Sequence, residues 1–162
     1  MKSYNFKIKL DEGAKAPEKA HDSDAGFDLF ANIKPYNFNK IKQTNAVLVD
    51  DQITIKAGGR ALIPTGVRIA LPEGWEAQVR PRSGSAINSG ITVLNSPGTI
   101  DAGYRGEIGV ILINTSNDLF SFEDGAKIAQ LVINKVPKTS LTVVEDIDNT
   151  ERGEKGFGST GV

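Results

Sequence analysis

The side chains that could do chemistry gather in four short clusters of polar residues and glycines, at 24–29, 81–86, 95–106 and 152–161. The third cluster carries a carboxylate, Asp101, and an amide, Asn95, between two apolar stretches. This pattern predicts a β-hairpin with a long loop. An exposed aspartate in such a loop could act as a general base on water, and the asparagine could read an amide-bearing base. The alternative is a structural hairpin in which Asp101 accepts hydrogen bonds from loop N–H groups.

The second and fourth clusters offer groups that bind phosphate. Arg82 supplies a fork of donors, Ser83 supplies a hydroxyl, and Gly84 allows close approach of the backbone. A helix that began here would also direct free N–H groups at an anion, although an ordinary strand-to-helix turn fits the pattern equally well. The fourth cluster combines glycines and hydroxyls with Arg152, and its N–H groups could hold an anion. For this cluster a disordered terminus is the alternative.

The first cluster holds two carboxylates, Asp24 and Asp28. Carboxylates this close in sequence could serve a hard cation such as magnesium, directly or through water. The alternative is an Asx-stabilised turn that leads into a strand. As a set, the clusters indicate a phosphate-bearing ligand, a carboxylate base and a mobile lid.

Composition excludes several other kinds of site. The chain has 162 residues, which suits one domain, and its formal net charge of -1 gives no electrostatic case for nucleic-acid binding. Cysteine is absent, which excludes disulfides, thiolate zinc sites and a cysteine nucleophile, and the single histidine, His21, excludes a multi-histidine metal site. The first residues lack the apolar core of a signal peptide, and no apolar run could span a bilayer. We therefore expect a soluble, cytoplasmic protein that does not bind membranes.

The elements that position these clusters should be strands, because the dominant hydrophobic period is two. Apolar residues alternate with polar ones at 4–10 and 75–80, and further strands are predicted at 46–49, 52–55, 61–63, 67–70, 91–94, 107–113, 127–133 and 141–144. Turn signals separate them at 57–59, 64–66, 72–74 and 123–125. Many short strands between turns predict an all-β sandwich or barrel, with at most one short helix that begins near Ser83.

Two segments stand apart from the strand pattern. Residues 32–45 are polar and rich in asparagine and lysine, so we expect an insertion or extra hairpin over about 32–51. Residues 149–162 are glycine-rich and almost free of aliphatic side chains, which is typical of a flexible tail. We therefore predict a β domain over 1–148 and a C-terminal lid over 149–162.

The same clusters, in this order, resemble the ordered motifs of the trimeric dUTPases. The matching stretches are 24–29, 81–86, 98–106, 125–133 and 152–161, of which 98–106 is highly specific. The resemblance runs from about Ile8 to the C-terminus. It implies a distorted jelly-roll-like β barrel, a glycine-rich mobile tail, and a homotrimer whose active sites are each built from all three chains.

The resemblance implies roles for individual residues of the hairpin. Asp101 matches the general base that activates the water attacking the α-phosphorus of dUTP. Tyr104 matches the ring that packs under the deoxyribose and leaves no room for a 2′-hydroxyl. Asn95 and the backbone near Gly109 match contacts to uracil. Further substrate contacts are expected at Gly98, Thr99 and Ile100.

The resemblance implies that the other matched residues hold a metal ion, bind phosphate or form the lid. Asp28 and Gln130 match residues that hold Mg²⁺ through its waters. The phosphate-binding segment consists of Arg82, Ser83 and Gly84. The tail provides γ-phosphate contacts and an aromatic that stacks on uracil; its matched residues are Arg152, Phe157, Gly158, Ser159 and Thr160. Lys155 departs from the family motif, which commonly has glycine there.

The activity that the resemblance implies is hydrolysis of dUTP to dUMP and pyrophosphate, which limits uracil in DNA and supplies dUMP for thymidylate synthesis. A dCTP deaminase shares the fold, but that family places a glutamate near the position of Asp101. Ammonia release from dCTP would separate these two enzymes. The alternative of a different class is a binding module that senses dUTP and contacts another protein through the insertion. The full set of catalytic matches favours an enzyme over this module.

Overall fold

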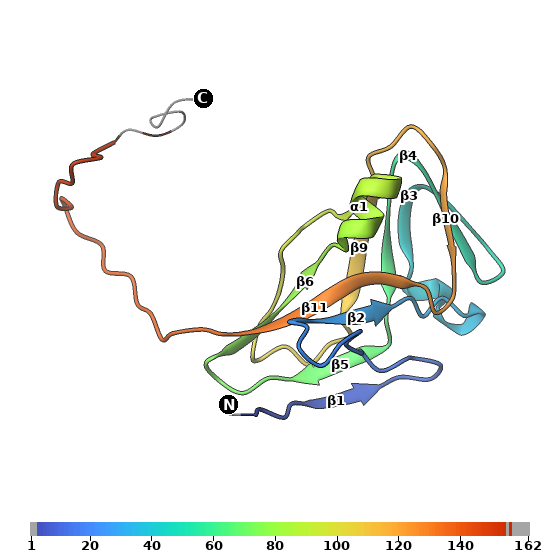
Figure 1. Ribbon diagram of the computed structural model, residues 1–162, viewed down its shortest axis with the longest axis horizontal. Helices are drawn as coiled ribbons and strands as arrows, with labels where there is room; N and C mark the ends of the chain where they lie inside the picture. Colours follow the sequence, from blue (N-terminus) through green and yellow to red (C-terminus); the bar gives the residue numbers. More distant parts are fainter. Residues whose placement is uncertain (1–2, 155, 157–162) are drawn as a thin grey trace.

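The computed structural model describes residues 3–154 and 156 of the chain. These residues form short strands, one α-helix and one 3₁₀ helix (Figure 1). The elements are β1 (Lys7–Leu10), β2 (Gly26–Phe30), η1 (Pro35–Lys40), β3 (Lys42–Val49), β4 (Gln52–Pro64), β5 (Val67–Ala70), β6 (Trp75–Arg80), α1 (Ser83–Ser89), β7 (Ile91–Val93), β8 (Gly98–Ile100), β9 (Gly109–Asn114), β10 (Phe120–Glu123) and β11 (Lys127–Lys135). The all-β fold class and the short helix near Ser83 are confirmed. Neither helix of the described part has the length and apolar character needed to cross a membrane.

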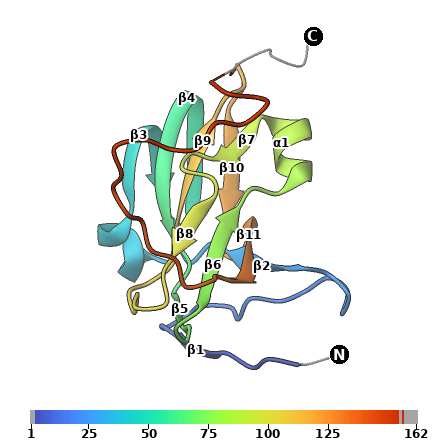
Figure 2. The same cartoon turned by 90° about the vertical axis from the view of Figure 1, so that its left-hand side faces the viewer.

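Two antiparallel sheets enclose the core. One runs in the order β10-β4-β9-β7, with β3 also paired to β4, and the other runs β2-β11-β6-β8. Figure 2 shows β8, β6 and β11 side by side in the second sheet. Alternate residues of these strands point inward and are almost fully buried, among them Ile53, Ile63, Val110, Ala77 and Leu131. Within the described residues the sheets stay open at their edges, so the jelly-roll-like fold is not a closed barrel.

The predicted turn at 57–59 is wrong, because β4 runs through these residues as one strand. Gly58 has a φ of +68°, and a Cβ on Gly59 would lie 2.2 Å from the carbonyl oxygen of Asn45. The register between β3 and β4 shifts at this point. The glycines therefore form a bulge within a strand, where backbones approach too closely for a side chain.

The two terminal strand predictions have different outcomes. At 4–10 a strand does form, β1, and among the described residues it pairs with β5; the predicted buried face is wrong, because Tyr4, Ile8 and Leu10 are 40–48% exposed. The strand predicted at 141–144 does not form: the segment is extended without ladder bonds, and Leu141 is fully exposed. At 4–10 the rings of Tyr4 and Phe6 pack against Trp75, whereas no layer of the described chain covers 141–144.

The polar segment at 32–51 forms η1 and β3, and its first residues are anchored in the body. Ile33 is fully buried, and its N–H donates to Oδ1 of Asp124 at 2.8 Å. Lys34 pairs with Asp124 at 3.3 Å and with Asp51 at 3.2 Å. The helix η1 was not anticipated, because its asparagine-rich sequence has no helical pattern. That 32–51 is an insertion remains a prediction.

Candidate active site

A hollow of about 340 Å³ lies at the loop that joins β8 to β9. Its lining residues come from β8, β9, the loop between them and β4: Leu62, Thr99, Ile100, Asp101, Tyr104, Glu107, Gly109 and Ile111. The hollow thus brings Asp101 together with four of the predicted substrate residues, Thr99, Ile100, Tyr104 and Gly109. The sequence analysis missed Leu62, Glu107 and Ile111 as lining residues. Leu62 reaches the hollow only because β4 pairs with β9, which no local pattern reveals.

Asp101 stands at the start of a tight turn at the exposed end of β8. Its carbonyl oxygen accepts the N–H of Tyr104 at 3.0 Å. Within the described residues no hydrogen bond or ion pair engages its carboxylate, so this group is open to a water molecule. This contradicts the structural alternative, in which loop N–H groups occupy the Asp101 carboxylate.

Tyr104 is held over the loop by its own neighbours. Its hydroxyl donates to the carbonyl oxygen of Glu107 at 2.9 Å. A Cβ on Gly106 would lie 2.3 Å from the phenol oxygen, so the ring lies directly against this glycine. Gly109 is restricted in the same way, since its Cβ would lie 2.7 Å from Cδ1 of Leu62. At both positions the Cβ of a larger residue would collide with the neighbouring side chain.

Asn95 lies at the other end of β8 from Asp101. It is exposed in the turn before a cis Ser96–Pro97 bond, and Gly98 is buried beside it. The ideal Cβ position of Gly98 is 3.3 Å from Nδ2 of Asn95. Asn95 is not among the residues that line the hollow around Asp101.

A second hollow, of about 270 Å³, is lined by Ala20, Asp24, Ala25, Gly26, Asp28 and Gln130. Here Asp28 pairs with Nε of Arg82 at 3.2 Å and with Nζ of Lys127 at 2.8 Å. Gln130 pairs with Asp28 in the β11–β2 ladder, and its Nε2 donates to the carbonyl of Pro81 at 3.0 Å. The first, second and fourth motifs thus meet at one place, as a shared site would require.

Lys127 is a member of this second site that the sequence analysis missed. Its hydrogen bond to Asp28 raises the pKa of the Lys127 ammonium group above its ordinary value. Ser83 and Gly84 are exposed in the first turn of α1, next to Arg82. The N–H groups of a first helical turn lack partners inside the helix. The result is a cationic rim beside the Asp28 carboxylate.

The side chains around Asp28 determine how a magnesium ion could be held here. No cluster of three or more His, Asp or Glu side chains in the described residues could hold a metal ion alone. Both Asp28 oxygens already contact cations, but each carboxylate oxygen can accept more than one hydrogen bond. Asp24, Asp28 and Gln130 therefore fit a hydrated cation held through its waters better than one bound directly.

The two hollows lie far apart in one chain. The sheet order β2-β11-β6-β8 separates Asp28 from the strand before Asp101 by three strand spacings, or about 14 Å. The registers place Asp101 about four residues further along the strand direction, or about 13 Å. The backbone positions of Asp28 and Asp101 are thus roughly 19 Å apart, so the two hollows are separate within one chain. A larger hollow of about 430 Å³ over β1 and β5 does not bridge them, and its one lining carboxylate, Asp11, is paired with Arg68.

The last predicted cluster is described only in part. Arg152 is exposed in the segment that follows β11. Four further predicted site residues, and Lys155, lie outside the described residues: Phe157, Gly158, Ser159 and Thr160.

The chain is similar to known proteins over most of its length. The dUTPase family model matches residues 46–161. The chain is 51% identical over 162 residues to a deoxyuridine 5′-triphosphate nucleotidohydrolase of Clostridium tetani, and 45% identical over 161 residues to that of Fusobacterium nucleatum; each match covers 99% of both chains. The solved structure of Staphylococcus bacteriophage 80alpha dUTPase with dUPNHPP superposes with a TM-score of 0.79, at 28% identity over 99% of this chain and 100% of that one. The chain therefore belongs to the dUTPase family.

Proposed function

We propose that this chain hydrolyses dUTP to dUMP and pyrophosphate, with Asp101 as the general base. The observation that carries the proposal is the Asp101 carboxylate, which has no partner in the described chain and lines the same hollow as Tyr104 and Gly109. A water held by Asp101 attacks the α-phosphorus and gives its proton to the carboxylate. The bond from the α-phosphorus to the bridging oxygen breaks, and pyrophosphate leaves. The product dUMP would serve thymidylate synthesis, and removal of dUTP would limit uracil in DNA.

The hollow at the β8–β9 loop suits a deoxynucleoside. Tyr104 offers a flat face whose position the Glu107 carbonyl fixes, which supports its role under the deoxyribose. The backbone at Gly109 lines the hollow beside the Leu62 side chain and carries no side chain of its own. Asn95 and this backbone supply donors and acceptors for uracil. A site built on such hydrogen bonds strongly rejects a base with the wrong pattern.

The second hollow suits the phosphates. Arg82, Ser83 and the backbone at Gly84 stabilise charge that grows on the departing pyrophosphate. Mg²⁺ would be held through its waters by Asp28 and Gln130, and when bound it offsets the charge of the triphosphate and fixes its shape.

We also propose a homotrimer in which Asp101 and Arg82 of one site come from different subunits. The support is the separation of roughly 19 Å between the two hollows of one chain. After Val136, whose N–H donates to Gly74 at 2.9 Å, the chain runs in extended form away from its own sheets (Figure 1). The segment after β11 therefore leaves the sheets of its own subunit (Figure 1), which supports a lid donated to another subunit's site. Light scattering tests the assembly, and a monomeric mass at working concentration would refute the shared site.

The activity itself is tested with magnesium, dUTP and each common dNTP, by measuring pyrophosphate. We expect release from dUTP and little from dCTP or dTTP. Asp101→Asn should still bind dUTP but lose most turnover, because an amide keeps the size of the side chain and cannot take the proton. Near-normal turnover of Asp101→Asn would remove Asp101 from the role of base.

A further inference from the structure

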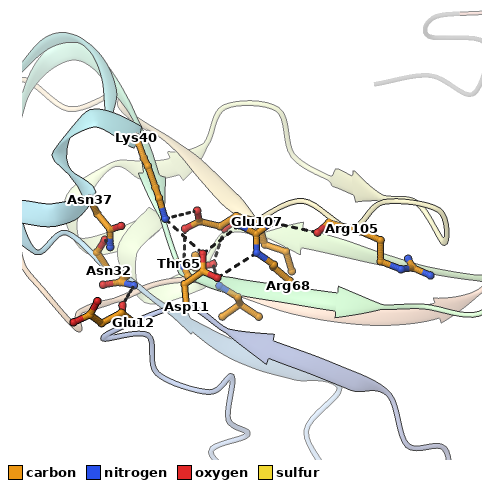
Figure 3. Close-up of polar contacts among 12 residues, drawn as sticks. Asp11, Glu12, Asn32, Asn37, Lys40, Thr65, Arg68, Arg105 and Glu107 are labelled. Carbon is orange, nitrogen blue, oxygen red and sulfur yellow. Dashed lines mark hydrogen bonds and ion pairs between the residues drawn. The ribbon is translucent and has the colours of Figure 1, made fainter.

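Four charged side chains form a cluster under the loop that carries Asp101 and Tyr104. This loop-base cluster consists of Asp11, Lys40, Arg68 and Glu107, contributed by four separate segments of the chain (Figure 3). Nζ of Lys40 lies 3.0 Å from Glu107 Oε2 and 3.5 Å from Asp11 Oδ2. Arg68 completes the cluster through two contacts with Asp11, at 3.2 and 3.3 Å. Lys40, from the end of η1, thereby links the 32–51 segment to the loop.

Glu107 ties this cluster to the backbone under the loop. Its Oε1 accepts the N–H of Gly66 at 2.7 Å, while its Oε2 faces Lys40. Its own carbonyl oxygen accepts the Tyr104 hydroxyl at 2.9 Å. The side chain of Glu107 therefore fixes the backbone group on which the Tyr104 ring depends.

A second tether holds the other side of Tyr104. Arg68 Nη1 donates to the carbonyl oxygen of Arg105 at 3.3 Å. Arg68 is itself fixed by Asp11, and this hydrogen bond lowers the pKa of the Asp11 carboxyl below its ordinary value. The residues on either side of Gly106 are thus both attached to the loop-base cluster.

The side chains of the cluster are buried enough for their ion pairs to hold the loop in place. The side chains of Glu107 and Asp11 are 15% and 21% exposed, and that of Lys40 is 36% exposed. Pairs at this depth are screened less than fully exposed ones. Removal of the Lys40 charge would leave the partly buried Glu107 carboxylate with fewer partners. The carboxylate would then move toward water, and the backbone carbonyl of Glu107 would be held less firmly.

We propose that Lys40 and Glu107 are positioning residues that set the preference of the enzyme for dUTP over UTP, acting through the Tyr104 ring. The proposal rests on the proposed function and on the contact of Tyr104 with the sugar. A ring that is free to shift by a fraction of an ångström makes room for a 2′-hydroxyl. Loss of Lys40 or Glu107 should therefore reduce the discrimination between the two sugars more than it reduces the turnover of dUTP.

The test compares kcat/KM for dUTP and for UTP in matched variants. Lys40→Met removes the charge and keeps the apolar stem, and Glu107→Gln keeps an acceptor for Gly66 N–H while it loses the charge. Each should lower the dUTP:UTP ratio of kcat/KM about tenfold. The double variant should fall no further, because both substitutions break the same link. Lys40→Arg should keep the wild-type ratio.

Lys34→Met is the matched control. Lys34 also bridges two carboxylates, at 3.2 and 3.3 Å, with 41% exposure, but none of its ion pairs among the described residues involves the loop. Its loss should leave the ratio unchanged even if the Tm falls. An unchanged ratio in Lys40→Met overturns the proposal, as does a lowered ratio in Lys40→Arg, and neither conclusion needs Glu107→Gln to fold. A wild-type protein without dUTP hydrolysis would instead refute the proposed function, and this inference with it.

Discussion

Replacing Gly106 with alanine should damage catalysis and spare the fold. A Cβ at this position would lie 2.3, 2.4 and 2.8 Å from Oη, Cζ and Cε2 of Tyr104. All three atoms belong to the far end of a side chain that is 44% exposed. The ring can therefore retreat toward solvent without disturbing the core.

The size of each effect follows from these contacts. To reach an ordinary contact distance of 3.4 Å, the ring must withdraw by about 1 Å, which also breaks its hydrogen bond to Glu107. A displacement of this size in a positioning group lowers a rate about 100-fold, and we expect that loss in kcat/KM for dUTP. Stability should change by less than about 1 kcal/mol. The lost hydrogen bond costs about 1 kcal/mol, and reduced freedom of the unfolded chain offsets about 0.4–1 kcal/mol.

The assay is pyrophosphate release over a range of dUTP concentrations, paired with urea unfolding. Gly103→Ala is the control in the same loop, because a Cβ there meets nothing within 4 Å and neither glycine has a left-handed φ. Gly103→Ala should keep activity within about twofold of wild type. Normal kcat/KM in Gly106→Ala would show that the observed position of the Tyr104 ring is not the one that catalysis uses.

Three further predictions concern fold, pH and tail. Gly59→Ala should destabilise the protein by about 2 kcal/mol in urea unfolding, because its Cβ meets the backbone oxygen of Asn45 at 2.2 Å; unchanged stability would contradict the bulge. Because Arg68 lowers the pKa of Asp11, the ionised carboxyl stabilises the fold above its unfolded value near 3.8, and this is lost as pH falls through the lower folded value. Asp11→Asn should therefore weaken the dependence of Tm on pH below about 4, and an unaltered profile would contradict that pairing. Removal of 149–162 should leave the Tm and the assembly nearly unchanged yet abolish efficient dUTP hydrolysis, whereas full activity would show that the tail is no lid.

The sequence predicted those elements whose local pattern agrees with their place in the fold. In β6, the apolar residues Ala77 and Val79 face the core, so their alternation identified a true strand. The helix after Arg82 begins where polar, glycine-containing residues follow a strand. The carboxylate of Asp101 was correctly placed in a decorated hairpin loop, because its two flanking strands carry strong apolar patterns.

The failures have one physical cause, which is that burial depends on partners distant in sequence. Leu141 and Val143 have strand spacing but no covering layer in the described chain. Gly59 resembles a turn residue, yet a neighbouring strand requires it inside β4. Lys40 and Glu107 are in contact only because η1 folds back onto the loop after β8, and their spacing in the sequence does not predict this contact.

The most direct test of the shared active site is a mixture of two inactive chains. Asp101→Asn lacks the base, and Arg82→Met lacks the phosphate contact and the partner of Asp28. Each variant alone should hydrolyse dUTP poorly. If the two residues of one site come from different subunits, unfolding and refolding an equal mixture should give trimers in which about one quarter of sites are intact. We predict pyrophosphate release at about one quarter of the wild-type rate per chain. A mixture no more active than the separate variants would contradict the shared active site.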